Sequence, residues 1–174
     1  MTELELLRQI DIFEVIFMPF VVTIIVSSLL GLERQNIGKS AGISAHILIG
    51  MATMVIAIVQ RFFFIEQGAT DVAENQRLIA QIMPGVGFIG AGVIMKGEKT
   101  IIGLTTAATI WAVAIMGLIA GSGYWRLGGS YGLFLVLFIF IRDFKRGINP
   151  FVAHVHYDFL DSEMIREDDK RRHA

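Results

Sequence analysis

The residues with the most recognisable chemical spacing are the glycines in the stretch PGVGFIGAGVIM. Gly85, Gly87 and Gly90 match G-x-G-x-x-G, the pattern that holds the phosphates of a dinucleotide. That chemistry requires a strand before the glycines, a helix that opens at them, and an acidic residue about 20 positions later. Residues 101–121 contain no acidic side chain, and the glycines lie inside an apolar segment. We therefore expect no nucleotide at this motif.

Ionisable side chains stand near the ends of two other apolar segments. Glu33 and Arg34 follow the first segment, and His46 lies one turn inside the second. One interpretation is a group that responds to protons or cations, because a histidine near a carboxylate titrates close to neutral pH. The other is an ion pair at the membrane boundary together with a hydrogen-bonded histidine. In the first interpretation His46 could approach Glu33.

Two further charges, Glu74 and Arg77, precede the glycine-rich segment. They suggest either the mouth of a site for a cation or partner, or a helix anchored at the lipid headgroups. Near the C-terminus, His154, His156 and Asp158 fall on one side of an extended strand, a spacing that can bind a metal. An amphipathic segment on the membrane explains the same residues, and we predict no metal site there.

The sequence lacks the residues that several classes of function require. The 174-residue chain has no cysteine, so thiolate metal sites and cysteine nucleophiles are excluded. It shows no Ser/His/Asp set and no phosphate-binding loop of the Walker type. The net charge of −1 provides no basic field for nucleic acid. We expect no enzyme, no cofactor and no nucleic-acid partner.

The elements that carry these residues are apolar and long. The chain is 54% hydrophobic and 18% charged, with a mean hydropathy of +0.63. Five segments approach the roughly 20 residues that a helix needs to cross a bilayer: 12–32, 42–64, 78–95, 101–121 and 127–141. Backbone groups in lipid must be paired internally, so we predict an all-α polytopic membrane bundle. Residues 1–148 form the membrane domain and 149–174 a short polar cytoplasmic tail.

The positive charges in the loops predict an orientation. With five spans, seven Lys and Arg residues fall on one side and four on the other. The first set is Arg34, Lys39, Lys96, Lys99, Arg142, Lys145 and Arg146, and the second is Arg8, Arg61, Arg77 and Arg126. The richer side is expected to be cytoplasmic, with the N-terminus outside. The acidic start and the lack of a small-residue cleavage site indicate that the first segment remains as a span.

As part of a membrane helix, the glycines provide smooth surfaces. Gly85 and Gly92 share one face, while Gly87, Gly90 and Ala91 lie on roughly the opposite one. Small residues let helix backbones approach closely in lipid. Similar stripes occur in the second segment (His46, Gly50, Thr53 and Ala57) and in the fourth (Thr105, Ala108, Thr109 and Ala112).

These stripes predict that segments two, three and four form the tight core, with one and five more peripheral. Leucine at Gly87 or Gly90 is then expected to disrupt assembly. The alternative is that Pro84 and the glycines break the helix and coordinate an ion through backbone carbonyls.

Three stretches together resemble the MgtC/SapB family of bacterial inner-membrane proteins. They are GLERQNIGKSAGISAH, RLIAQIMPGVGFIGAGVIM and GLTTAATIWAVAIMGLIAGSGY. The residues that match the family pattern are Gly31, Glu33, Arg34, Lys39, Ala41, Gly42, His46, Arg77, Gly85, Gly87, Phe88, Gly90, Ala91, Gly92, Gly103, Leu104, Thr105, Thr106, Ala107, Ala108 and Trp111. The chain departs from the pattern at Ser44, where an arginine is common, at Glu74, where an aspartate is common, and at Pro84, where a small polar residue is common.

The resemblance implies a protein of the bacterial cytoplasmic membrane linked to magnesium limitation, acid stress and virulence. It implies regulation of a membrane complex such as the ATP synthase. The small-residue face of the third segment would be the helix contact with that partner, or would build a homo-oligomer in the bilayer. The alternative is a channel or transporter for Mg²⁺ or another cation. Many members also carry a soluble ACT-like C-terminal domain, whereas only the 149–174 tail follows here, so we expect no ligand sensing of that kind.

Overall fold

The computed structural model describes residues 11–66, 72–96 and 101–152, with only the backbone at 72–76 and 78. The helical segments are η1 (Phe13–Phe17), α2 (Met18–Asn36), α3 (Ile43–Glu66), α4 (Val72–Gly92), α5 (Leu104–Ile119), η2 (Ala120–Tyr124) and α6 (Trp125–Lys145). The strands β1 (Met95–Lys96) and β2 (Ile101–Ile102) pair antiparallel between α4 and α5. The π-helical segment η1 leads directly into α2, and the π-helical segment η2 directly follows α5.

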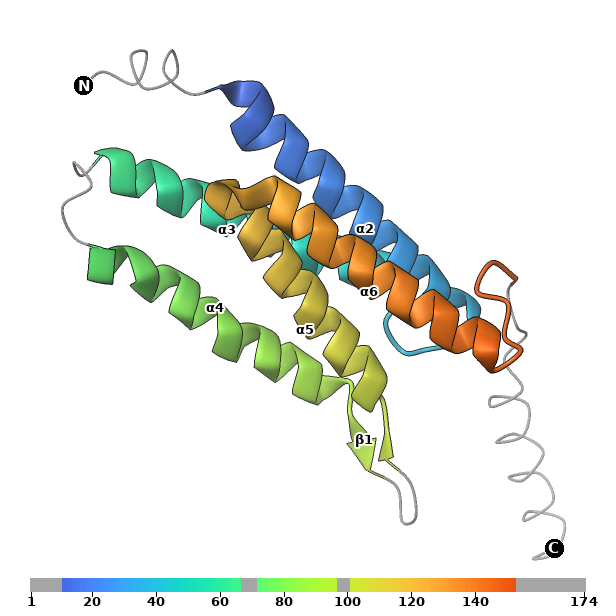
Figure 1. Ribbon diagram of the computed structural model, residues 1–174. Coiled ribbons are helices and arrows are strands. Elements are labelled where there is room, and N and C mark those ends of the chain that lie inside the picture. The colour runs from blue at the N-terminus through green and yellow to red at the C-terminus, as the bar shows by residue number, and fades with distance from the viewer. Residues whose placement is uncertain (1–10, 67–71, 97–100, 153–174) are drawn as a thin grey trace, which may run out of the picture.

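The long helices run back and forth across the molecule, so that successive helices are antiparallel (Figure 1). Three stretches are long and apolar enough to span a membrane: Phe13–Asn36, Ile43–Glu66 and Leu104–Lys145. The third stretch contains both α5 and α6. The chain reverses direction between these two helices at Gly123, whose φ is +99°. The apolar part of α4, Ile79–Gly92, is shorter. The predicted all-α membrane bundle is confirmed.

The tightly packed interior lies where α2, α3 and α5 meet. A Cβ added to Gly117 of α5 would collide with the backbone carbonyl of Gly50 in α3, and one added to Gly121 would collide with that of Met54. On the α2 side, a Cβ on Gly50 would lie 2.6 Å from the Ser27 hydroxyl. Only glycine permits backbones to approach this closely, so these positions fix the distances between the three helices.

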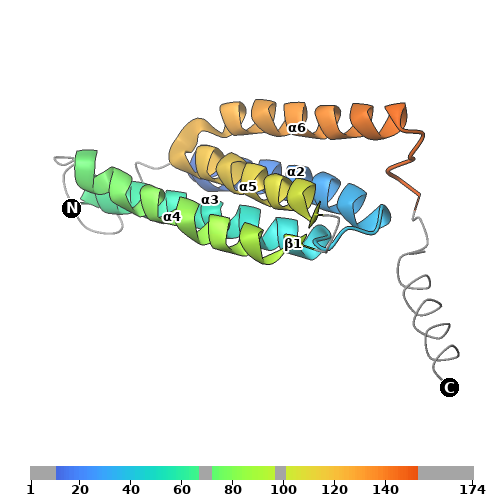
Figure 2. The ribbon, with the colours of Figure 1, turned by 90° about the horizontal axis from the view of Figure 1, so that it is seen from below.

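The last helix, α6, covers α2 and α5 from one side. Its Gly132 lies under Val26 of α2, where an added Cβ would be 2.7 Å from a valine methyl group. Val136 and Ile139 continue the same buried stripe and belong to the apolar cluster around Leu30. Figure 2 shows α6 as a separate outer layer, with α2 and α5 between it and α3.

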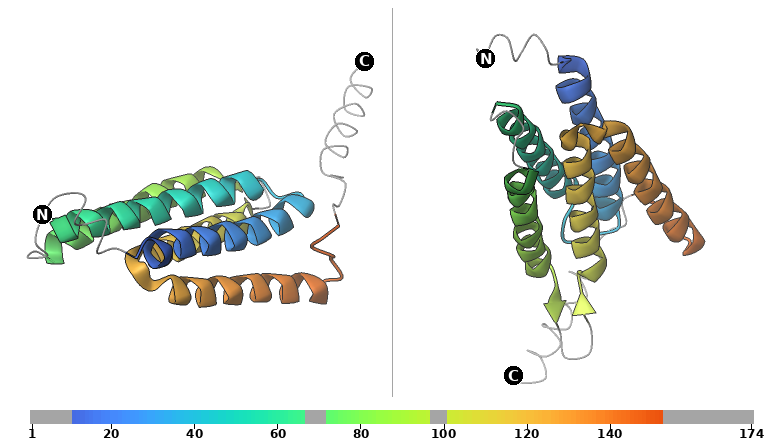
Figure 3. Two further views of the ribbon diagram at one scale, coloured as in Figure 1. Left: turned by 90° about the horizontal axis from the view of Figure 1, so that it is seen from above. Right: turned by 60° about the vertical axis from the view of Figure 1, so that its left-hand side comes forward.

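The opposite edge of the bundle is formed by α4 (Figure 3). It is held through one narrow stripe, in which Val86 packs with Ile110 and Ala114 of α5. The prediction that segments two, three and four form the core with segment one peripheral is therefore wrong. Leu30, Thr23 and Ser27 of the first segment are completely buried, and α4 lies outside. The stripe predicted in the second segment is buried at His46, Gly50, Thr53 and Ala57. The stripe predicted in the fourth segment is wrong as a close contact, because Thr105 and Ala108 are exposed and the close approaches are made by Gly117 and Gly121.

The β1–β2 hairpin corrects two predicted boundaries. The third segment was predicted to extend to residue 95 and the fourth to begin at 101, but the helices end at Gly92 and begin at Leu104. Gly103 explains the change, because its φ is +90° and an added Cβ would collide with the Val93 carbonyl. A left-handed residue with the preceding helix end against it cannot continue a helix.

Candidate functional site

Four charged side chains meet where the ends of α2 and α6 lie together, and we call them the charge cluster: Glu33, Arg34, Arg142 and Asp143. The Arg34 guanidinium donates to both carboxylate oxygens of its neighbour Glu33. Arg142 Nη2 and Nε lie 2.7 and 2.8 Å from Asp143 Oδ1. The two pairs are linked, because Arg142 Nη2 is 3.6 Å from Glu33 Oε1 and Arg34 Nη2 is 3.8 Å from Asp143 Oδ2.

The charge cluster is buried and electrically balanced. Glu33, Arg34 and Asp143 are at most 1% exposed, and Arg142 is 21% exposed. Removing ions from water is costly, and only mutual pairing with good geometry offsets that cost. Two guanidinium groups face two carboxylates, and among the described residues one of the four carboxylate oxygens, Asp143 Oδ2, is buried with no hydrogen bond. The arrangement locks the end of α2 to the end of α6, and any change in one charge leaves another buried charge unpaired.

The segment after α6 adds a second tie at this end. Asn36 Nδ2 donates a hydrogen bond of 2.8 Å to the Pro150 carbonyl oxygen. Phe151 packs edge-to-face on Phe140 of α6, with ring centroids 5.3 Å apart. The chain therefore turns back over the ends of the two helices that carry the charge cluster. His154, His156 and Asp158, considered above for metal binding, lie outside the described residues.

His46 is held by a different set of partners from those expected. It is completely buried, with Nδ1 2.9 Å from the Gly42 carbonyl oxygen and Nε2 3.1 Å from Thr109 Oγ1. Because a carbonyl only accepts, Nδ1 carries a hydrogen. The Thr109 hydroxyl also lies 2.8 Å from the Thr106 carbonyl oxygen, so its single hydrogen is offered to either of two acceptors. No hydrogen bond joins His46 to Glu33 among the described residues.

The other charged candidates lie at the opposite end of the bundle. Arg77 belongs to the first turns of α4 and is exposed, and Glu74 lies one turn before it. The charge cluster sits at the far end of the antiparallel helices (Figure 1). The structure thus separates the predicted charged residues into two groups and brings only Glu33 and Arg34 together.

Most of the α4 motif faces outward. An added Cβ on Gly85, Gly87 or Gly92 would meet no atom within 4 Å, whereas Gly90 is buried, with Ala107 of α5 3.7 Å from its Cβ position. Phe88 is 81% exposed and Ala91 is also exposed. We call this surface, comprising Gly85, Gly87, Phe88, Ala91 and Gly92, the open face of α4.

The matching motif at the start of α5 is divided between interior and surface. Gly103 forms the turn described above, and Thr106 is buried. Thr105 is exposed, and the Trp111 side chain is 45% exposed on the outside of the bundle.

Sequence reasoning missed half of the charge cluster. Arg142 was counted only for orientation, and Asp143 was not considered. An available signal was the pair of adjacent opposite charges directly after an apolar segment, on the same predicted side of the membrane as Glu33 and Arg34. Within residues 11–66, 72–96 and 101–152, no group of three histidine or acidic side chains could hold a metal ion. The chemistry offered by the described site is charge pairing and helix contact.

Comparison with known proteins gives one consistent result. The profile of the MgtC family matches residues 20–146. The chain is 41% identical over 129 residues to a putative magnesium transporter, YhiD, of Escherichia coli K12, covering 70% of this chain and 60% of that protein. It is 34% identical over 130 residues to protein SapB of Bacillus subtilis, with 72% and 56% covered. Protein MgtC of Salmonella typhimurium strain 14028s is 34% identical over 102 residues, with 59% and 41% covered.

The matched region includes the charge cluster, His46 and the open face of α4. The chain spans about 60% or less of the length of these relatives. No solved structure matches the chain.

Proposed function

The chain belongs to the MgtC family, and from that premise we propose that it is a regulatory membrane protein that acts by helix contacts with another membrane protein. The observation that supports this proposal is the open face of α4. Three glycines and an alanine surround the exposed Phe88, and no part of the described chain covers them. In lipid such a surface gains little from hydrophobic burial but much from close backbone approach by a second helix.

The partner follows from the family resemblance noted in the sequence. It points to the ATP synthase as the membrane complex, and to magnesium limitation, acid stress and virulence as the setting. The same face suits a second copy of this chain, so a homo-oligomer belongs to the proposal. The cytoplasmic membrane is the proposed location, with the N-terminus outside and the C-terminus inside. A reporter that is active only outside the cell should remain inactive when fused after Ala174.

The test compares substitutions on α4 with the same side chain elsewhere. Gly87→Leu and Gly92→Leu place bulk on the open face, and Ala52→Leu places it on the exposed side of α3 as a control. We expect the wild type and Ala52→Leu to co-purify with the ATP synthase and to lower ATP synthesis in membrane vesicles. The two glycine variants should fold but lose both properties. Retention of both by the glycine variants would rule out the open face as the contact.

A second candidate function is cation transport, and two observations favour it. A relative carries the name putative magnesium transporter, and buried polar side chains lie at the contacts of α3 with α2 and α5, among them Thr23, Ser27 and Thr53. Against it, Mg²⁺ prefers carboxylates and water, and the buried carboxylates Glu33 and Asp143 are already paired with arginines. Purified protein in liposomes should show no Mg²⁺ flux. Flux that disappears in Glu33→Gln would establish the second function instead.

A further inference from the structure

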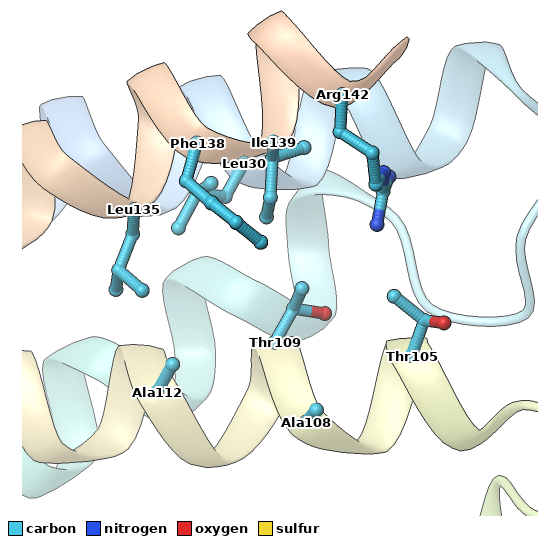
Figure 4. A pocket seen from close by; sticks show the side chains of 9 residues that line it. All are labelled: Leu30, Thr105, Ala108, Thr109, Ala112, Leu135, Phe138, Ile139 and Arg142. Atoms are coloured by element: carbon cyan, nitrogen blue, oxygen red, sulfur yellow. The ribbon is translucent and has the colours of Figure 1, made fainter. Parts of the chain in front are cut away.

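A groove runs between α5 and α6 on the outside of the bundle. It has a volume of about 140 Å³, and Figure 4 shows side chains from both helices pointing into it. Ala108 and Ala112 form its α5 wall, and Leu135, Phe138 and Ile139 form its α6 wall. Arg142 stands at one end, near Thr105. The groove is therefore apolar along its length, with one cationic end.

The groove opens toward the lipid. Ala108 is exposed, and Phe138 is 58% exposed. An apolar hollow of roughly 150 Å³ excludes water and accepts a benzene-sized hydrocarbon. If the groove were empty, the side chains of its walls would lose the dispersion contacts that packed interiors make. In a bilayer the nearest hydrocarbon is the acyl chain of a lipid.

The cationic end lies at the depth of a headgroup. With its 21 residues, α6 is as long as the bilayer hydrocarbon is thick, about 30 Å. Arg142 is in the last turn of this helix, and Lys145 and Arg146 follow it at exposed positions. An acyl chain lying in the groove thus places its phosphate beside three cations. Glu33 and Asp143 balance the charge of Arg34 and Arg142, so Lys145 and Arg146 leave an excess of positive charge.

Arg142 retains donors for such a phosphate. Its bonds to Asp143 use Nε and Nη2. A guanidinium has five N–H groups, and within the described residues the two on Nη1 of Arg142 donate to no other group. We propose that the groove between α5 and α6 binds one acyl chain of an anionic phospholipid, whose phosphate group is recognised by Arg142.

The proposal is tested on the full chain by native mass spectrometry in detergent, with added lipids of identical acyl chains. The wild type should retain one phosphatidylglycerol per chain about tenfold better than phosphatidylethanolamine, the effect expected of cations at a headgroup. Glycerol 3-phosphate, which has the phosphate but no acyl chain, should not displace the lipid. Equal retention of the two lipids would overturn the assignment of the headgroup.

The groove itself is tested by filling it. Ala108→Leu places a larger side chain in the groove, and Ala52→Leu makes the same change on the exposed side of α3. We expect Ala108→Leu to lose at least tenfold in lipid retention and Ala52→Leu to match the wild type. A photoreactive acyl chain should also label residues 105–112 and 135–142 in the wild type. If Ala108→Leu leaves lipid retention unchanged, or changes only the oligomeric state, the groove is not a lipid site.

Discussion

The glycines of α3, α5 and η2 differ from the glycines of α4 in what surrounds them. At Gly117 and Gly121 an added methyl group would collide with the backbone of the neighbouring helix. At Gly85 and Gly87 it would meet nothing within 4 Å. The first group sets distances inside one chain, and the second leaves a smooth surface that the chain does not use for itself. A small-residue pattern in a membrane helix therefore indicates close approach without saying whether the neighbour belongs to the same molecule.

The largest effect is expected at Gly117. Gly117→Leu forces the backbones of α3 and α5 apart, and the free energy of unfolding should fall by at least about 4 kcal/mol, so that little folded protein is recovered. Gly87→Leu should change it by less than about 1 kcal/mol in the isolated chain. Thermal unfolding in detergent, followed by size-exclusion chromatography, measures both. Equal damage at the two positions would show that the two groups of glycines do not differ as described.

Asp143→Asn should have the next largest effect, because the interior depends on charge as well as on close packing. The substitution leaves the buried Arg34 and the partly buried Arg142 against the single carboxylate of Glu33, and a broken buried ion pair costs about 3 kcal/mol. The free energy of unfolding is measured by denaturation in mixed micelles.

The double variant Asp143→Asn with Arg142→Gln restores neutrality and should recover at least about 1 kcal/mol of this loss. No recovery would mean that Asp143 contributes through shape and not through charge.

A smaller effect is expected at the hydroxyl that partners His46. Thr109→Val keeps the side-chain shape but removes the hydrogen bond to Nε2, with a loss of about 1 kcal/mol. Thr105→Val makes the same change at an exposed position one turn earlier and should cost less than about 0.5 kcal/mol. The same unfolding measurement separates the two, and identical values would contradict the buried bond.

The smallest expected effect is a small increase in the free energy of unfolding. Alanine favours a helix over glycine by up to about 1 kcal/mol, and Gly85→Ala meets no neighbouring atom. The isolated chain should therefore become slightly more stable. If Gly85→Ala lowers the stability of the monomer, the open face of α4 is packed in solution. If it lowers only the recovery of oligomer or partner complex, the contrast with Gly117 is strengthened.

The sequence was sufficient to predict the membrane bundle and its five helical segments, because lipid imposes helix length and apolar composition directly. It also predicted the buried small-residue stripe of α3, but in α5 it selected residues that line an open groove instead of Gly117 and Gly121. It did not predict that α4 lies outside, since glycines suit an internal and an external neighbour equally well. Asp143 was missed for a related reason: its partner Arg34 is distant in sequence, and only folding brings the ends of α2 and α6 together.

The turn at Gly123 has a consequence for how the protein reaches the membrane. Its left-handed backbone connects η2 to α6 with no intervening loop, and an added Cβ would lie 2.7 Å from the Arg61 guanidinium. No separate loop stands between these two apolar helices. We therefore expect α5 and α6 to enter the bilayer together as one hairpin, with Gly123 near its tip.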